Sequence, residues 1–293
     1  MDALAITKPP AGNGAAPPQM QRARGRAEIG IHSRNGKNAL RRLVQDGCGK
    51  ARLPRIGNSS CEQAVLINTS GGITGGDALD WTVEVDGGAS FTMTTQACEK
   101  IYAANPADDP ATVSTRLSIG PSAALNWLPQ ETILFDGAKL SRTITALLAE
   151  DARLLMVEPV MFGRKAMGEA MTHGHFSDRW RIYRDGNLVH AEGFSVSGDI
   201  ADQLAGSFAM GEHSAMATLA LFAPDADAQL DALQSLLQNL PHTMAAATAW
   251  NGKLVARLVA EDSYQLRRTL MPSIALLNQG SHGSVGVPKV WAL

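Results

Sequence analysis

Two carboxylates lie within a strongly apolar stretch near the middle of the chain. Glu131 and Asp136 are separated by Thr-Ile-Leu-Phe and follow Trp-Leu-Pro at positions 127–129. A carboxylate that leaves water without a partner costs several kcal/mol. Both side chains are therefore expected to be ion-paired, hydrogen-bonded, or exposed for a functional reason.

Other acidic residues share this setting, because each stands beside apolar residues or glycine. The full set is Asp77, Glu99, Glu131, Asp136, Glu158 and Glu169. The simplest interpretation pairs them in structural salt bridges with Lys100, Lys139, Arg142, Arg164 or Lys165.

His173-Gly-His175, with Glu169 four residues before His173, is the nearest approach to a metal site. Alternate residues of a strand point the same way, and imidazole suits divalent nickel or zinc. A tight site needs a third or fourth ligand and residues that orient them, and none is evident nearby in the sequence. Transient nickel ligation and an ordinary exposed pair of histidines therefore both stay open.

The remaining motifs give no support for catalysis. The run Gly71–Asp77 contains four glycines but lacks the Gly-Lys-Ser/Thr ending of a nucleotide-binding loop and is followed by a strand pattern, so we expect tight bends with positive φ. Cys98 lies in a strand-like run and is interpreted as a buried structural thiol. No serine lies in a G-x-S-x-G turn.

Composition describes a soluble globular protein. Of 293 residues, 45% are apolar and 18% are charged, and the net charge of −2 gives no reason to expect nucleic acid or a membrane as partner. Cys48, Cys61 and Cys98 are odd in number and have no C-x-x-C spacing, which favours a reducing compartment. No apolar run reaches the roughly 18 residues of a membrane span and no secretory signal is evident, so we expect a cytoplasmic protein.

Period-two alternation predicts that residues 23–210 form a body of short strands behind a disordered Pro/Ala/Gly-rich tail at 1–22. The first strand is expected near Gly25, and Asp185-Gly186-Asn187 is expected to turn a hairpin. The other alternating runs are 79–85, 91–95, 113–119, 154–158, 176–183 and 188–194.

Residues 211–293 are expected to form a small mixed layer packed on this body. Helices are predicted over Ala228–Leu240, capped by Asp225, and over Ser263–Leu277, with strands near 217–222 and 254–259. Gly280, Gly283 and Gly286 indicate a flexible connection to the final residues. The fold class is therefore β-rich α+β, with strands arranged as a sandwich or as a β-helix-like stack.

Four blocks together resemble the urease accessory protein D (UreD) family in order and spacing, from about Gly25 to the C-terminus. The blocks are Val65–Asp77, Thr94–Tyr102, Trp127–Gly137 and Pro288–Trp291. The resemblance implies the stacked β-helix-like fold and a non-enzymatic, cytoplasmic protein. It also implies a complex with accessory proteins F and G, the last a GTPase, that docks on apo-urease while nickel is inserted.

The resemblance further implies a polar interior tunnel, for which the candidate residues are Asp77, Glu99, Glu131, Asp136 and Glu158. Micromolar affinity already corresponds to about 8 kcal/mol, so a conduit must bind nickel weakly. No tightly bound cofactor is expected, and GTP would bind only the partner. Two alternatives remain: a metal-dependent hydrolase that uses Glu169, His173 and His175, and a purely structural adaptor whose acids are only paired charges.

Overall fold

The structure is a computed structural model that describes residues 21–54, 62–206, 209–238, 240, 242–278 and 287–292. Cys61, positions 1–20 of the predicted tail, and the predicted connection through Gly280, Gly283 and Gly286 lie outside these residues. In the described part of the chain, no helix is long and apolar enough to cross a membrane.

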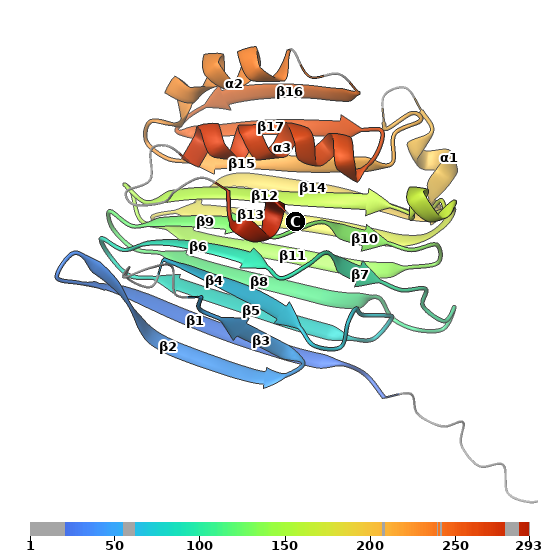
Figure 1. Cartoon of the computed structure of the whole chain (residues 1–293), viewed down its shortest axis with the longest axis horizontal. Helices are drawn as coiled ribbons and strands as arrows, with labels where there is room; N and C mark the ends of the chain where they lie inside the picture. The colour runs from blue at the N-terminus through green and yellow to red at the C-terminus, as the bar shows by residue number, and fades with distance from the viewer. Residues whose placement is uncertain are drawn as a thin grey trace, which may run out of the picture.

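Two β-sheets face each other and form most of the molecule (Figure 1). The first sheet contains, in spatial order, β14 (Asn187–Asp199), β13 (His173–Arg184), β11 (Lys139–Leu148), β8 (Ala111–Ile119), β5 (Ala78–Val85), β1 (Arg24–Arg34) and β2 (Lys37–Gly47). The second contains β16 (Thr243–Trp250), β17 (Lys253–Ala260), β15 (Ala215–Phe222), β12 (Arg153–Phe162), β9 (Ala124–Leu128), β6 (Ser90–Thr95), β4 (Gln63–Asn68) and β3 (Gly49–Arg52). The short strands β7 (Glu99–Ile101) and β10 (Thr132–Leu134) join it beside β12.

The chain crosses repeatedly from one sheet to the other, so that successive passes stack. Strands β5, β8, β11 and β13 pair in parallel in the first sheet, and β4, β6, β9 and β12 do so in the second. Parallel neighbours require such crossovers. The β-rich α+β class is confirmed. The sequence left open a sandwich or a β-helix-like stack, and the parallel pairing matches the stack.

Strand positions follow the alternation where only one face of a strand is buried. In β5, Leu79, Trp81, Val83 and Val85 point into the core, and the chain then turns at Gly87-Gly88 toward the second sheet. Asp185 and Gly186 have φ of 46° and 77° and turn the hairpin between β13 and β14, as predicted. Every residue of β12 is buried, because one face of β12 meets the first sheet and the other meets helix α3.

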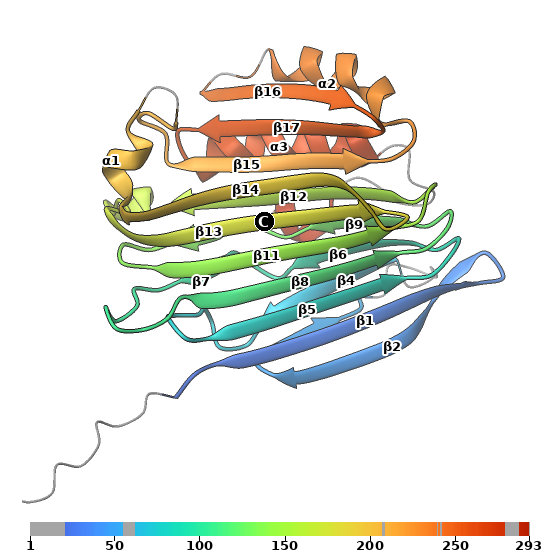
Figure 2. The same cartoon turned by 180° about the vertical axis from the view of Figure 1, so that it is seen from behind.

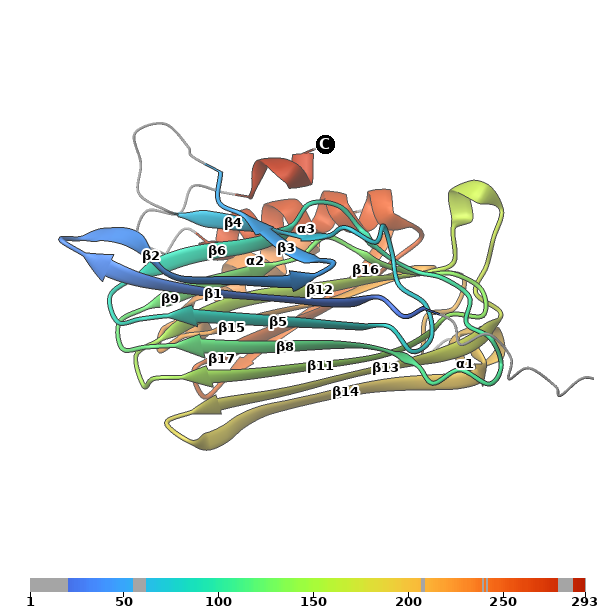
Figure 3. The same cartoon turned by 90° about the horizontal axis from the view of Figure 1, so that it is seen from below.

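The C-terminal strands continue the second sheet, because β15 pairs antiparallel with β12 and β17 and β16 follow it. Helix α3 (Ser263–Asn278) lies on the outer side of that sheet (Figure 3) and matches the predicted helix within one residue. Helix α2 (Leu230–Leu237) starts later than predicted, after the 3-10 turn η2 (Ala226–Gln229).

The predicted cap at Asp225 is wrong. Its side chain makes no capping hydrogen bond and instead lies 3.5 Å from Nη1 of Arg153. Three short helical elements in the described part of the chain were also not predicted from the sequence. They are α1 (Ile200–Leu204), η1 (Lys165–Met167) and η3 (Lys289–Ala292).

Candidate functional site

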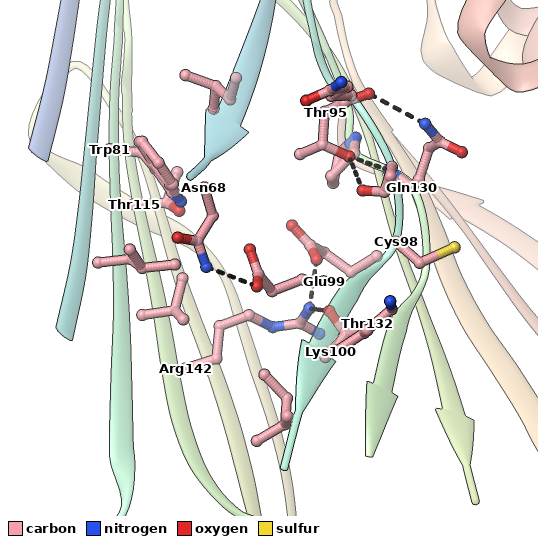
Figure 4. A pocket seen from close by; sticks show the side chains of 18 of the residues that line it. Asn68, Trp81, Thr95, Cys98, Glu99, Lys100, Thr115, Gln130, Thr132 and Arg142 are labelled. Carbon is pink, nitrogen blue, oxygen red and sulfur yellow. Dashed lines mark hydrogen bonds and ion pairs between the residues drawn. The ribbon is translucent and has the colours of Figure 1, made fainter. Parts of the chain in front are cut away.

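A cavity of about 270 Å³ lies between the two sheets (Figure 4). Strands β5, β8 and β11 supply one wall, and the segments around β6, β7, β9 and β10 supply the other. Apolar walls come from residues such as Leu79, Trp81 and Leu140, whereas Asn68, Glu99 and Arg142 bring polar groups to the same space. The candidate site is therefore an internal, mixed-polarity space.

Arg142 ties the two sheets together at the deep side of this cavity. From β11 its guanidinium donates to Asp178 of β13, with Nε to Oδ1 at 3.0 Å and Nη2 to Oδ2 at 2.6 Å. Its Nη1 donates to Glu158 of β12 at 2.5 Å, and the indole N–H of Trp127 donates to the other oxygen of Glu158 at 2.7 Å. Arg142 is 4% exposed, so this is a buried charge cluster of one cation and two acids. The predicted pairing of a candidate acid with Arg142 is confirmed.

Burial and the neighbouring charges act in opposite directions in this cluster. Burial alone would lower the pKa of Arg142, yet Asp178 and Glu158 hold it above its ordinary value. Burial raises the pKa of Glu158 to about 7, even though Arg142 and Trp127 stabilise the charged carboxylate. One guanidinium therefore incompletely compensates two carboxylates.

Glu99, at the start of β7, is the cavity carboxylate without a cationic partner. The amide of Asn68 donates to its Oε1 at 2.9 Å, and no ion pair to Glu99 is found among the described residues. Burial raises its pKa to about 7, against the opposing effect of the Asn68 hydrogen bond. Figure 4 shows Asn68, Glu99 and Arg142 around the same space.

Glu131 has a partner that no local pattern indicated. Arg267 of α3 forms a two-pronged ion pair with it, with Nε to Oε1 at 3.0 Å and Nη2 to Oε2 at 2.5 Å. The thiol of Cys98 also donates to Glu131, at 3.3 Å. Burial, together with the charge of Glu131, raises the pKa of Cys98 to about 12. Cys98 lies between the bend at residues 96–97 and the start of β7 and is half-buried, so the predicted buried strand position is wrong. The raised pKa disfavours the thiolate that a nucleophile needs.

Asp77 and Asp136 accept hydrogen bonds from backbone N–H groups at turns. Asp77 accepts from the backbone of Ala23 and Thr74, each at 2.8 Å. Asp136 accepts from the backbone of Thr172 at 2.7 Å and of His173 at 3.0 Å, and although burial opposes them, these bonds lower its pKa. Neither residue lines the cavity beside Glu99.

The glycine run before β5 forms bends, as the sequence predicts. Gly71, Gly72 and Gly76 have φ of 78°, 148° and 79°. A Cβ on Gly72 would meet the ring of Tyr102 at 2.4 Å, so the close approach also requires glycine.

The structure does not gather Glu169, His173 and His175 into a metal site. Glu169 forms an ion pair with Arg164, with Nε to Oε2 at 2.6 Å, as the salt-bridge interpretation predicts. His175 lies 3.4 Å from the hydroxyl of Ser141, and His173 contacts Thr172. Over the described ranges, no group of three or more His, Cys, Asp or Glu side chains is placed to hold a metal ion.

Asp178 is a site residue that sequence reasoning missed, although a signal was present. It falls between Phe176 and Trp180 on the inward phase of β13, where a charged residue is unexpected. Arg142 likewise falls on the inward phase of β11, between Leu140 and Ile144. An ionisable residue on the buried phase of an alternating strand was the available indication.

Known proteins resemble this chain over nearly its whole length. A family model described as UreD urease accessory protein matches residues 23–292. The urease accessory protein UreD of Mesorhizobium japonicum is 47% identical over 278 residues, which cover 95% of this chain and 97% of the relative. The proteins of the same name from Chelativorans sp. and Agrobacterium fabrum are 46% and 45% identical, and cover 95% and 94% of this chain and 97% and 94% of their own lengths.

Proposed function

The chain belongs to the UreD urease accessory protein family, and from that premise we propose that it is a non-enzymatic chaperone of urease maturation. In this proposal it works in the cytoplasm with accessory proteins F and G and docks on apo-urease. GTP binds only to protein G, and this chain holds no cofactor tightly. Its own contribution is a sheltered interior route for nickel.

The observation that carries this proposal is the cavity with Glu99 in its wall. Glu99 is half-buried, and a carboxylate that loses water without gaining a cation costs free energy, part of which a divalent cation would recover. The cavity lining brings two carboxylates, Glu99 and Glu158, together with amide and hydroxyl groups, and these offer oxygen ligands. Lys100, Arg142 and the single thiol of Cys98 line the same space, so it holds no closed set of imidazole or thiolate ligands. Such a site holds a hydrated cation weakly, which is what transit requires.

The geometry divides the candidate acids into two groups. Glu131 is neutralised by Arg267, and Asp77 and Asp136 bind backbone N–H groups, so all three have a structural role to fill. Glu99 and Glu158 line the cavity, and neither is fully compensated. We therefore assign the nickel route to the Glu99 and Glu158 side of the cavity.

The test is a Glu99→Gln variant, which keeps the shape of the side chain and an oxygen that can accept from Asn68. We expect urease activation at limiting nickel to fall about tenfold while the complex still assembles, since the variant loses an interaction of about 1.4 kcal/mol or more with the cation. Glu84→Gln on the outer face of β5 is the matched control, because Glu84 is 38% exposed and should change nothing. Equal activation by both variants would remove the nickel route.

A structural adaptor is the second candidate, and the Arg142 cluster favours it. Arg142, Glu158 and Asp178 join three strands and both sheets, which is sufficient reason for these charges to be present. Under this candidate Glu99→Gln leaves nickel incorporation unchanged, so the same experiment separates the two functions.

A further inference from the structure

The cavity opens through a break in the second sheet, beside Glu99. Strand β6 ends at Thr95 and β7 begins at Glu99. The exposed residues of the cavity lining all lie at this break: Gly71, Gln96, Ala97 and Lys100. The first sheet, which faces the viewer in Figure 2, pairs without interruption through β5, β8 and β11 behind the same space. A cation that enters from solvent therefore reaches the half-buried Glu99 before the buried Glu158.

Asn68, the last residue of β4, holds Glu99 by a neutral hydrogen bond. Its Nδ2 donates to Oε1 of Glu99 at 2.9 Å, across 31 positions of the sequence, and Figure 4 shows the contact at the cavity. An amide donor carries no charge, so the negative charge of the carboxylate is not cancelled. Glu131 differs, because the guanidinium of Arg267 binds both of its oxygens.

Ser70 determines which end of the Asn68 amide faces Glu99. The backbone N–H of Ser70 donates to Oδ1 of Asn68 at 3.0 Å. A backbone N–H can only donate, so the atom that it meets must be the amide oxygen, and the NH₂ group is left for Glu99. The far side of this turn is anchored beside β7, where the N–H of Ile73 donates to the carbonyl of Lys100 at 2.9 Å. The amide is therefore fixed between the turn and Glu99.

The turn by itself does not require asparagine at position 68. An aspartate makes the same turn, because a carboxylate oxygen accepts from the N–H two residues later as an amide oxygen does. The two side chains differ at the atom that faces Glu99, where an aspartate would bring two like charges together. Glu99, rather than the turn, therefore selects the amide.

The charged and titratable side chains around the same space come from both walls. They are Cys98 and Lys100 beside Glu99, Arg142 of β11 and Glu158 of β12. Arg142 is bound by Glu158 and Asp178, the thiol of Cys98 donates to Glu131, and no ion pair joins any of these groups to Glu99 among the described residues.

The Asn68 hydrogen bond opposes the effect of burial on Glu99. Burial raises the pKa of Glu99 to about 7, whereas the Asn68 amide, followed by the backbone N–H of Lys100, acts to lower it. A hydrogen bond to the charged form of an acid favours that form. Without the amide, Glu99 would hold a proton at neutral pH, and an incoming cation would have to displace it.

We propose that Asn68 is a positioning residue of the nickel route, which holds Glu99 at the cavity opening as an uncancelled carboxylate for a hydrated divalent cation. The inference rests on the proposed function, because Glu99 acts on nickel only if the cavity is the route. A cationic side chain at position 68 would neutralise Glu99, as Arg267 neutralises Glu131. The neutral amide keeps the carboxylate in place and leaves its charge for the metal.

The pH profile of nickel incorporation tests this role. Apo-urease is matured with accessory proteins F and G, limiting nickel and a soluble chelator from about pH 6 to about pH 9, and nickel per active site is counted. We expect Asn68→Ala to move the pH of half-maximal protection upward by about one unit and to reduce protection near pH 7 about fivefold, since roughly a tenth of Glu99 would then be ionised. Thr69→Ala is the matched control in the same turn. Thr69 is exposed and donates to the carbonyl of Cys48, so its profile should match wild type.

The inference and the proposed function fail in different ways. If Glu99→Gln abolishes protection and Asn68→Ala keeps the wild-type midpoint, the inference is overturned and the proposed function stands. If neither variant changes protection, both are overturned. A loss in Asn68→Ala that is equal at every pH would assign Asn68 a purely structural role and would also overturn the inference.

Asn68→Asp supplies a second measurement if Asn68→Ala does not fold. This substitution keeps an oxygen for the N–H of Ser70 and replaces only the group that faces Glu99. In urea denaturation of the chain alone, Glu99→Gln should alter the pH dependence of stability up to the folded pKa of Glu99. With Asn68→Asp also present, we expect this pH range to extend upward by about one unit or more, because facing carboxylates oppose ionisation. An unchanged range would overturn the inference.

Discussion

Replacing Arg142 with methionine tests the charge cluster that joins the sheets. The substitution leaves Glu158 and Asp178, each 6% exposed, without their shared cation. Breaking a buried ion pair by removing one partner costs about 3–5 kcal/mol. For a chain of this size that loss corresponds to a fall of about 10 °C in the unfolding temperature.

The pH dependence of the Arg142→Met variant gives the sharper result. Burial already raises the pKa of Glu158 to about 7, and removing the guanidinium raises it further above the unfolded value, so that Glu158 is held neutral in the folded variant. Folding then takes up protons, and the deficit relative to wild type should shrink as pH falls from about 8 to about 5. Urea denaturation followed by circular dichroism at the two pH values measures both effects.

Two controls separate this reasoning from general fragility. Arg116→Met removes an exposed arginine that lies 3.7 Å from Asp80 and should cost less than about 1 kcal/mol. Adding Glu158→Gln and Asp178→Asn to Arg142→Met should recover most of the loss, because no unpaired charge then remains buried. A loss below about 1 kcal/mol, or one that is independent of pH, would refute the account of the cluster.

Three further outcomes are expected. Glu99→Gln should stabilise the chain at about pH 8 by on the order of 2 kcal/mol and leave its stability unchanged near pH 4. The pKa of Glu99 is raised to about 7 in the folded chain, so wild-type stability falls as pH rises from the unfolded pKa to the folded pKa. A variant less stable than wild type at pH 8 would contradict this. Glu131→Gln should speed the reaction of Cys98 with a disulfide reagent, because burial and the charge of Glu131 together raise the thiol pKa to about 12 and the variant removes that charge. Cys98→Ser identifies the signal, and an unchanged rate would exclude the contact. Gly72→Ala should lower the free energy of unfolding by about 3 kcal/mol and Gly71→Ala by about 1 kcal/mol, both measured by urea denaturation. The difference arises because only the new methyl group at position 72 would meet the Tyr102 ring. Equal losses would show that backbone strain alone sets the cost.

Strands with one buried face were predictable, and strands with other surroundings were not. The alternation of Leu79 to Val85 identified β5, because apolar and polar residues face different media there. Strand β12 is covered on both faces and β16 is rich in alanine, so neither shows a clear period of two over its full length. Their strand conformation follows from pairing with β9, β15 and β17.

The candidate site was partly predictable for a similar reason. Glu99 and Glu158 were identified because acids beside apolar residues are unusual, and the structure places both in the cavity. The Glu131 to Arg267 pair joins residues 136 apart in sequence, and nothing local to either residue indicates the other. The closeness of Glu169 to two histidines in the sequence suggested a metal site, but in the structure Glu169 forms an ion pair with the nearby Arg164.

The sheltered route for nickel is the central claim, and interception by a chelator tests it most directly. Apo-urease is matured with limiting nickel in the presence of accessory proteins F and G and a soluble chelator, with and without this chain, and nickel per urease active site is counted. The account predicts that the chain protects incorporation from the chelator and that Glu99→Gln loses this protection. Equal interception with wild type, with Glu99→Gln and without the chain would contradict it.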